Sequence, residues 1–364
     1  MKKVTVIFGT RPEAIKMCPL VNELKKRKNI ITTVCVSGQH RDMVKSVTEF
    51  FSVKADIDLS VMREGQSLSS LTERILSGMS EALRDNASDL ILVHGDTVTA
   101  FAAALAGFYE RIPIGHVEAG LRTYDADSPF PEEFNRRAIS VMAKYHFAPT
   151  EVARENLIRE GVDVGRIFVT GNTVTDALKY TVSKRYDHPL LRSSKGKRLV
   201  LLTVHRRENR GEPMVNIFTA VRKIVKKYAD VEVVYPMHMD PDIRRLAKEY
   251  LFGCDGIRIT EPLSVMDFHN FLARSYAAIT DSGGIQEEAA FLGIPVLVAR
   301  ENTERPEGIS SGNLMTVGTD VDRICNAFDR LSDNGELYMS MSQGSMIYGD
   351  GRVSERIADI IEKI

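Results

Sequence analysis

Short apolar runs alternate with longer helical segments along this chain of 364 residues, and the pattern occurs twice. In the first half, the runs predict strands over residues 4–8, 33–37, 90–94, 114–117 and 145–148. Residues 12–26, 67–83 and 98–109, which lie between them, have the periodicity of helices. This alternation favours a mostly parallel sheet covered by helices on both faces.

The second half repeats the plan, with strands expected over residues 199–204, 232–236, 257–260, 277–280 and 296–299. Two such blocks predict an α/β fold of two Rossmann-like domains, in keeping with a usual domain size of about 150 residues. The polar segment 184–197, which contains Pro189, marks the expected boundary. We therefore expect domains over residues 1–182 and 183–352, followed by an amphipathic terminal helix over 353–364.

Composition excludes several classes of protein. The 48 basic and 49 acidic residues give a net charge of -1, which does not favour nucleic-acid or membrane-surface binding. The apolar run after Met1 is interrupted by Gly9 and Arg11, and is too short for a signal peptide. The four cysteines are scattered without CxxC spacing, so we expect reduced thiols and a cytoplasmic location.

Polar and glycine-containing segments follow most of the predicted strands. They cover residues 9–13, 37–42, 95–97, 118–123, 205–209, 237–240 and 281–289. Ligands of open parallel sheets bind beyond the carboxyl ends of the strands. We therefore expect an active site in a cleft between the two domains, lined by these segments.

One of these segments has the features of a phosphate site. Ser282, Gly283 and Gly284 leave a predicted strand and begin a helix, where free backbone N–H groups attract anions. Arg11 and Lys16, at the start of the first helix, carry charges that suit the same diphosphate. An ordinary helix start with glycines for packing is the alternative interpretation.

NAD-dependent oxidation and P-loop phosphoryl transfer are disfavoured, because neither the GxGxxG nor the GxxxxGK[ST] motif follows a predicted strand. Histidines and carboxylates also lack the spacing of a known metal motif. We expect neither a metal nor a redox cofactor.

Carboxylates at strand ends provide candidate acids and bases. The set comprises Asp96, Glu118, Glu132, Glu133 and His205. Clustered carboxylates perturb one another's pKa, as acid–base catalysis requires. The simpler alternatives are that one glutamate only complements the helix dipole, and that His205 belongs to a solvated basic loop.

Taken together, the motifs resemble those of the non-hydrolysing UDP-N-acetylglucosamine 2-epimerases. The matching strings span nearly the whole chain: GTRPEAIKMCPL, GQHR, VHGDT, HVEAGLRT, SPFPEEFNR, TGNTVTDAL, HRREN, DSGGIQEEA and TERPE. The resemblance implies the two-domain fold of the GT-B glycosyltransferases. In that fold the terminal helix packs back on the first domain.

The resemblance also implies a reaction, the reversible inversion of UDP-GlcNAc to UDP-ManNAc at C2. In this family UDP is eliminated to give 2-acetamidoglucal and is then added back, without a cofactor. Asp96, Glu118, Glu132 and His205 match the catalytic positions, and the assignment of acid and base among them stays open.

Binding positions follow from the same motifs. Residues implied to bind UDP and the substrate are Arg11, Lys16, Phe268, Ser282, Gly283, Gly284, Glu288 and Arg305. Those implied to bind a second UDP-GlcNAc as an allosteric activator are Gln39, His40, Arg63, Arg206 and His238. Asp42 departs from the Gln or Glu usual in the family, which puts the activator contact in doubt. Phe268 also fits an ordinary core position, and Gln39 and Arg63 fit ordinary surface positions.

Relatives of the family form homodimers and supply ManNAc for cell-surface polysaccharides, so the resemblance implies both here. Three alternatives remain open from the sequence: a glycosyltransferase of the same fold, a hydrolysing or diacetamido-uronate 2-epimerase, and a non-catalytic UDP-sugar sensor. The carboxylate set favours proton transfer over the first and the third, and the intact GTRPEAIK string disfavours the second.

Overall fold

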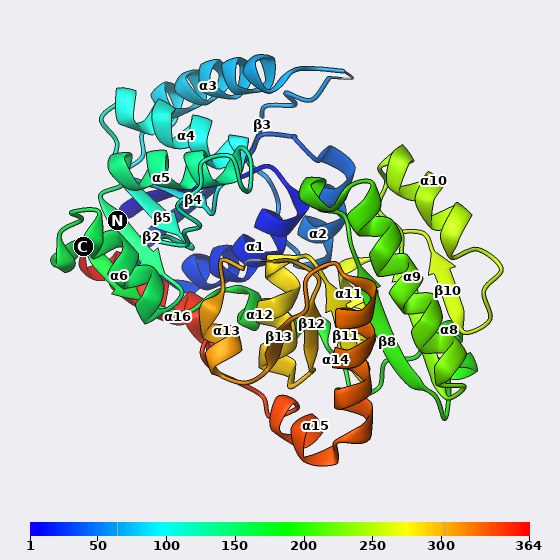
Figure 1. Cartoon of the computed structure of the whole chain (residues 1–364). Coiled ribbons are helices and arrows are strands. Elements are labelled where there is room, and N and C mark those ends of the chain that lie inside the picture. Colours follow the sequence, from blue (N-terminus) through cyan, green and yellow to red (C-terminus); the bar gives the residue numbers. More distant parts are fainter. Residues whose placement is uncertain (64, 302) are drawn as a thin grey trace. The chain divides into compact units, whose positions relative to one another are not determined.

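The computed structural model describes residues 1–63, 65–301 and 303–364. These residues form two compact units, one comprising Met1–Ala177 with Gly349–Ile364 and the other Leu178–Tyr348. Each unit contains a parallel sheet with helices packed against it (Figure 1), which confirms the predicted α/β class. Within the described residues, no helix has the length and apolar character needed to cross a membrane. All four cysteines lie in the described part of the chain and are free thiols.

The first unit has a sheet of seven strands within the described residues. In spatial order they are β3 (Ile57–Asp58), β2 (Ile30–Val36), β1 (Lys2–Phe8), β4 (Leu90–His94), β5 (Ile114–Val117), β6 (Tyr145–Ala148) and β7 (Ile167–Val169). The helices are α1 (Arg11–Lys26), α2 (Arg41–Phe50), α3 (Leu68–Asp85), α4 (Val98–Tyr109), α5 (Glu132–Met142), α6 (Glu151–Arg159) and α16 (Val353–Lys363), with a short 3-10 helix η1 (Val164–Arg166). The division between the units falls within α7 (Val174–Thr181).

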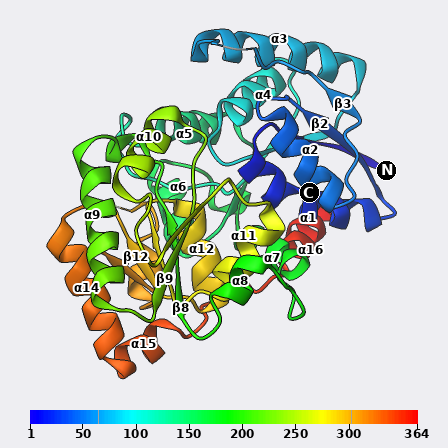
Figure 2. The same ribbon diagram turned by 90° about the vertical axis from the view of Figure 1, so that its right-hand side faces the viewer.

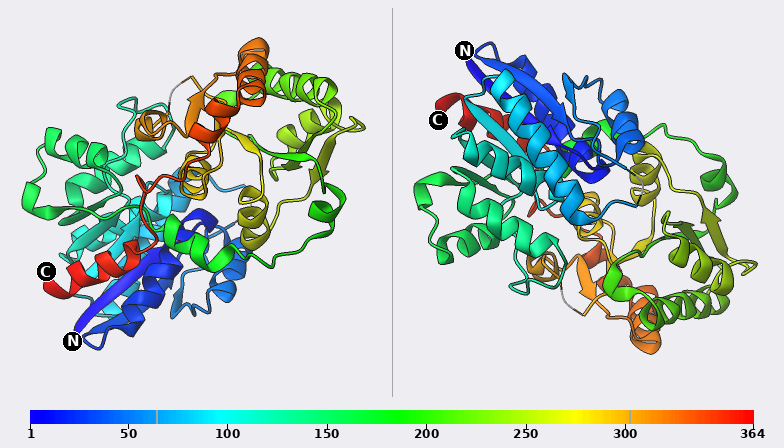
Figure 3. Two further views of the ribbon diagram at one scale, coloured as in Figure 1. Left: turned by 90° about the horizontal axis from the view of Figure 1, so that it is seen from below. Right: turned by 90° about the horizontal axis from the view of Figure 1, so that it is seen from above.

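Apolar packing fixes the helices of the first unit. Helices α3, α4 and α5 lie side by side, and their buried side chains join Ile7, Ile91 and Val93 of the sheet in one core. Helix α16 packs along α1, where Figure 3 shows the red terminal helix beside the blue one. The Asp176 carboxylate accepts the N–H of Val353 at 3.0 Å and so holds the first turn of α16.

The second unit has a sheet of six strands, again counted over the described residues. They are β10 (Ile257–Thr260), β9 (Val231–Pro236), β8 (Arg198–Thr203), β11 (Ala277–Thr280), β12 (Val296–Val298) and β13 (Leu314–Thr316). The helices are α8 (Pro189–Ser193), α9 (Glu212–Lys227), α10 (Pro241–Tyr250), α11 (Val265–Leu272), α12 (Gly283–Leu292), α13 (Pro306–Ser310), α14 (Val321–Asp333) and α15 (Gly335–Met341), with a 3-10 helix η2 (Arg207–Asn209).

Strand β8 shows why this sheet is covered on both faces. Val200 and Leu202 join the core made with α9, α10 and α14, whereas Leu199 and Leu201 join the core made with α11 and α12. Successive side chains of a strand point to opposite faces, so a run of apolar residues requires helices on both sides. Figure 2 shows α9 and α14 together on one side of this unit, where they pack against each other.

Candidate active site

In the first unit, the predicted polar loops lie at one edge of the sheet. Strands β2, β1, β4 and β5 are neighbours and parallel, so the segments that follow them leave the sheet at the same end. The Gly95 N–H donates to the Val117 carbonyl at 2.9 Å, which places the loop after β4 beside Glu118. The structure thus brings together Asp96 and Glu118, the two carboxylates expected at strand ends.

Glu118 is buried and paired with a cation. Its carboxylate forms an ion pair with the Lys16 ammonium and accepts a hydrogen bond from the Asn172 amide. The Glu118 backbone has a φ of 65°, in the left-handed region that non-glycine residues seldom occupy. Backbone strain of this kind is concentrated at functional sites, because the surrounding contacts must hold it in place.

His94 Nε2 lies 3.7 Å from the Glu118 carboxylate. Burial lowers the pKa of His94 to about 4, although the Glu118 charge opposes the shift. The imidazole is therefore neutral at pH 7, and Lys16 supplies a positive charge that pairs with Glu118.

Asp96 belongs to a second ion-pair chain. Arg136 Nη2 lies 2.6 Å from the Asp96 carboxylate, and Arg136 Nη1 lies 3.6 Å from Glu133. Glu133 is fully buried and accepts the backbone N–H groups of Thr123 and Tyr124, both at 3.0 Å. Glu133 therefore anchors a loop and positions Arg136.

Glu132 is the first residue of α5 and is only half-buried. Of the two neighbouring glutamates, Glu132 is the one that retains some exposure to solvent, as an acid or base acting on a ligand requires.

Glu13 was not singled out from the sequence, although it lies at the centre of this edge. Its buried carboxylate accepts the Gly9 and Thr10 N–H groups at 3.0 and 2.7 Å, and the Thr97 hydroxyl at 2.7 Å. Burial raises the pKa of Glu13 to about 7, against the opposing effect of these hydrogen bonds. The signal that was available in the sequence is the spacing of Thr10 and Glu13, which is that of a helix capping box.

The other expected positions of the first unit lie around this edge. Arg11 is the first residue of α1, and the His40 N–H donates to the Gly9 carbonyl at 2.8 Å. The Gln39 amide oxygen accepts from the Thr99 hydroxyl at 2.9 Å. Arg63 is exposed in the segment after β3.

In the second unit, Asp281 organises the loop that carries His205. Its buried carboxylate accepts the N–H groups of His205 and Arg206 at 3.0 and 2.9 Å, and the Asn209 amide at 3.0 Å. The His205 and His238 rings are stacked, with centroids 5.3 Å apart. The structure thus places His205, Arg206 and His238 at one edge of the second sheet.

The start of α12 has the geometry of an anion site. Ser282 is the N-cap residue and Gly283 the first residue of the helix, so N–H groups of the first turn point away from the helix body. A Cβ atom at Gly283 would lie 2.4 Å from Arg305 Nη1, so only glycine allows the guanidinium this close. Gly284 is half-buried and has more room, since the nearest atom to its Cβ would be at 3.9 Å.

Glu288 and Phe268 lie in the same unit. Glu288 is nearly buried, with His269 Nε2 at 3.6 Å from its carboxylate, and His269 Nδ1 is 2.7 Å from the Thr181 hydroxyl. Phe268 packs partly on the core shared by α11 and α12. The structure therefore agrees with a core position for Phe268 as readily as with a ligand contact.

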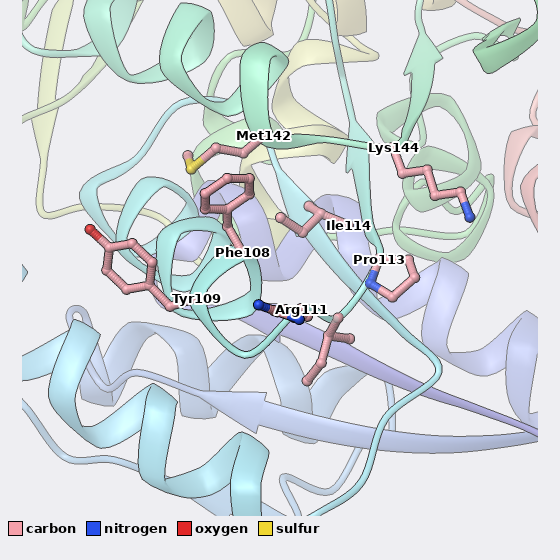
Figure 4. A pocket seen from close by; sticks show the side chains of 8 residues that line it. Phe108, Tyr109, Arg111, Pro113, Ile114, Met142 and Lys144 are labelled. Carbon is pink, nitrogen blue, oxygen red and sulfur yellow. The ribbon is translucent and has the colours of Figure 1, made fainter.

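A surface pocket of the first unit lies elsewhere. It is lined by Phe108 and Tyr109 at the end of α4, by residues leading into β5, and by Met142 and Lys144 (Figure 4). These residues surround the amino ends of β5 and β6, so the pocket is at the opposite end of the sheet from Asp96 and Glu118. Across the described residues, no group of three or more His, Cys, Asp or Glu side chains is arranged to hold a metal ion.

Comparison with known proteins gives a consistent result. The family model described as UDP-N-acetylglucosamine 2-epimerase matches residues 22–362. The UDP-N-acetylglucosamine 2-epimerase of Bacillus subtilis is 50% identical over 357 residues, which cover 98% of this chain and 94% of that protein.

Solved structures agree. The UDP-GlcNAc 2-epimerase from Neisseria meningitidis bound to UDP-GlcNAc has a TM-score of 0.95 and 42% identity, with both chains fully covered. The Methanocaldococcus jannaschii UDP-GlcNAc 2-epimerase in complex with UDP-GlcNAc and UDP has a TM-score of 0.88 and 31% identity, again with both chains fully covered. This chain therefore belongs to the UDP-N-acetylglucosamine 2-epimerase family.

Proposed function

We propose that this protein catalyses the reversible epimerisation of UDP-GlcNAc to UDP-ManNAc at C2, without hydrolysing the product. The observation that carries the proposal is the cluster of carboxylates at the ends of β4 and β5, with Lys16 and Arg136 as their cationic partners, in a chain of this family. Such a cluster suits proton transfer next to a departing anion.

The proposed reaction is an elimination followed by an addition. A carboxylate removes the C2 proton, the C1–O bond to the diphosphate breaks, and the released electron pair forms the C1=C2 bond of 2-acetamidoglucal. UDP then adds back to C1 while a proton is delivered to the other face of C2. Atoms and electrons balance, so no oxidant or reductant is needed.

Asp96, Glu118, Glu132 and His205 form the proposed acid–base group. Glu118 is fixed by Lys16 and Asn172, and Asp96 by Arg136, so both carboxylates have defined positions before substrate binds. Preorganised charges of this kind stabilise a transition state without reorganisation during the reaction.

UDP binding is proposed at the start of α12 and its surroundings. The N–H groups after Ser282 and the Arg305 guanidinium suit a diphosphate, and Glu288 suits a ribose hydroxyl. Phe268 is proposed beside the uracil ring, and Arg11 and Lys16 near the nucleotide.

The deciding experiment is NMR of UDP-GlcNAc turnover in deuterated water. We expect UDP-ManNAc to form without an acceptor, with deuterium incorporated at C2. Asp96→Asn and Glu118→Gln should abolish both signals, whereas Glu155→Gln, at an exposed position of α6, should leave both unchanged. Unaltered exchange in the Asp96→Asn variant would remove Asp96 from the acid–base group.

The same experiment separates the alternatives. Free ManNAc as the main product identifies a hydrolysing enzyme, and strict dependence on an acceptor identifies a glycosyltransferase. Binding without any turnover identifies a sensor.

Three further properties are proposed from family membership. They are a cytoplasmic homodimer, the supply of ManNAc to cell-surface polysaccharides, and activation by a second UDP-GlcNAc at Gln39, His40, Arg63, Arg206 and His238. The stacking of His238 on His205 supports a link between the last site and the catalytic group. A rise in the rate of UDP-ManNAc turnover on adding UDP-GlcNAc tests the activation.

A further inference from the structure

Glu304 has no role in the reaction proposed above, although three arginines converge on it. Its side chain is 2% exposed. Oxygen Oε1 lies 3.2 Å from Arg206 Nη2 and 2.7 Å from Arg305 Nη1, and Oε2 lies 2.6 Å from Arg300 Nη1. One buried carboxylate therefore contacts three cationic side chains.

Two further carboxylates contact these arginines. Glu287 accepts a hydrogen bond from Arg305 Nε at 2.7 Å, and Glu208 lies 3.3 Å from Arg300 Nη2. Buried charges are tolerated when they are paired and hydrogen-bonded, and removing one partner leaves the others uncompensated. The positions of these arginines thus depend on one another.

Arg206 comes from a different loop of the second unit than Arg305 does. Arg206 lies in the loop after β8, which Asp281 holds, and Arg305 precedes α13. Both contact the same oxygen of Glu304, so a movement of either guanidinium changes the charge environment of the other.

Arg305 also lies over the anion site. The short distance from its guanidinium to Gly283 places the charge at the start of α12. Whatever fixes Arg305 therefore fixes the charge that a diphosphate meets there.

We propose that Glu304 is a positioning residue that couples Arg206 to Arg305, so that the state of Arg206 sets the affinity of the α12 site for a diphosphate. The inference rests on the proposed function in taking Arg305 as a diphosphate ligand. An anion that draws Arg206 away from Oε1 removes one of the two guanidinium groups that contact this oxygen and so strengthens its pairing with Arg305. By thermodynamic reciprocity, a diphosphate that draws Arg305 away strengthens the pairing of Glu304 with Arg206.

A double-mutant cycle tests this with UDP as the probe. The Kd of UDP is measured by calorimetry for the wild type, Arg206→Ala, Glu304→Gln and the double variant. Gln keeps the shape of Glu304 and removes its charge. We expect Arg206→Ala to change the Kd of UDP by a factor that differs at least threefold between the wild type and the Glu304→Gln variant. A double-mutant cycle isolates the interaction between the two substituted residues.

The coupling is contradicted if the change in Kd of the double variant equals the product of the changes in the two single variants to within threefold. This holds even where each single variant weakens UDP binding. Glu301→Gln is the matched control, since Glu301 is an exposed glutamate of the same loop that pairs with Arg323 at 3.2 Å. Its cycle with Arg206→Ala should show no coupling, and thermal unfolding should confirm that every variant folds.

The cycle measures binding and not turnover. A wild-type protein that binds UDP with coupling but forms no UDP-ManNAc contradicts the proposed reaction alone. Binding without coupling contradicts the role of Glu304 alone, and absence of UDP binding contradicts both.

Discussion

The Thr97 hydroxyl donates a hydrogen bond to the Glu13 carboxylate across 2.7 Å, and this bond joins the start of α1 to the loop that carries Asp96. Residues 84 positions apart in the sequence are thereby held together beneath the carboxylate cluster. Glu13 also accepts two backbone N–H groups from the loop after β1. A buried acid of this kind determines both the geometry of the loops and their response to pH.

Glu13→Gln should make the stability of the protein less dependent on pH. The pKa of Glu13 is raised from 4.5 to about 7, so the folded state binds the proton more tightly than the unfolded state does. The resulting stabilisation is complete below pH 4.5 and is lost as the pH rises through 7. Such a shift corresponds to about 3 kcal/mol.

Urea unfolding of the wild type and of Glu13→Gln at pH 5 to 8 measures this effect. We expect the wild type to lose stability relative to the variant as the pH rises. A difference between them that is the same at every pH would show that Glu13 titrates normally.

Thr97→Val should lower kcat more than it changes the affinity for UDP. The substitution removes the bond to Glu13 and also the N-cap bond that the Thr97 side chain accepts from the Ala100 N–H at 3.0 Å. The expected loss of stability is about 1–2 kcal/mol. Thr97→Ser keeps the hydroxyl, so it should retain most of the wild-type kcat; an equal loss in both variants would contradict the role of the hydrogen bond.

Acid should destabilise the first unit through its buried histidines. Burial lowers the pKa of His94 to about 4, of His116 to about 3 and of His146 to about 4. A histidine with a lowered pKa stabilises the fold above its ordinary value of 6.5, and this contribution is lost as the pH falls toward the folded value.

The measurement is again urea unfolding, between pH 7 and 4. His116→Gln removes one of the three groups while keeping a donor for the Gly95 carbonyl, which His116 Nε2 contacts at 2.7 Å. The variant should therefore lose less stability than the wild type over this range. If the wild type and the variant lose the same stability over this range, His116 is not a source of the acid sensitivity.

The central strands and the edge strand β10 were predictable from the sequence, whereas the short edge strands β3, β7 and β13 were not. Every residue of β4 and β5 is buried, and His94 and His116 are the only polar side chains in these two short strands. Strands β3, β7 and β13 lie at sheet edges, have two or three residues each, and are partly exposed. Such short segments have neither an apolar run nor a clear alternation of apolar and polar residues. The sequence therefore did not predict them as strands.

The same distinction applies to the candidate site. The carboxylates at strand ends are local features, so Asp96 and Glu118 could be found from the strands that precede them. The partners of Glu13 and Glu304 are long-range contacts, from Glu13 to Thr97 and from Glu304 to Arg206, which no local pattern specifies. Glu133 was predicted as a candidate acid, but its hydrogen bonds to Thr123 and Tyr124 indicate a structural role.

Gly283→Ala should weaken UDP binding by about tenfold or more, the loss expected when a charged hydrogen-bonding group is displaced. The added methyl would lie 2.4 Å from Arg305 Nη1 and 2.8 Å from Glu304 Oε1, so the guanidinium has to move away from the start of α12. Gly284→Ala is the matched comparison, because its methyl would lie 3.9 Å from Glu288 Oε1, at an ordinary contact distance. Both substitutions favour the helix to a similar extent, since alanine has a higher helix propensity than glycine. Calorimetric titration with UDP should therefore give a clearly larger loss of affinity for Gly283→Ala, and equal losses would mean that Arg305 does not bind the diphosphate from the position it holds over Gly283.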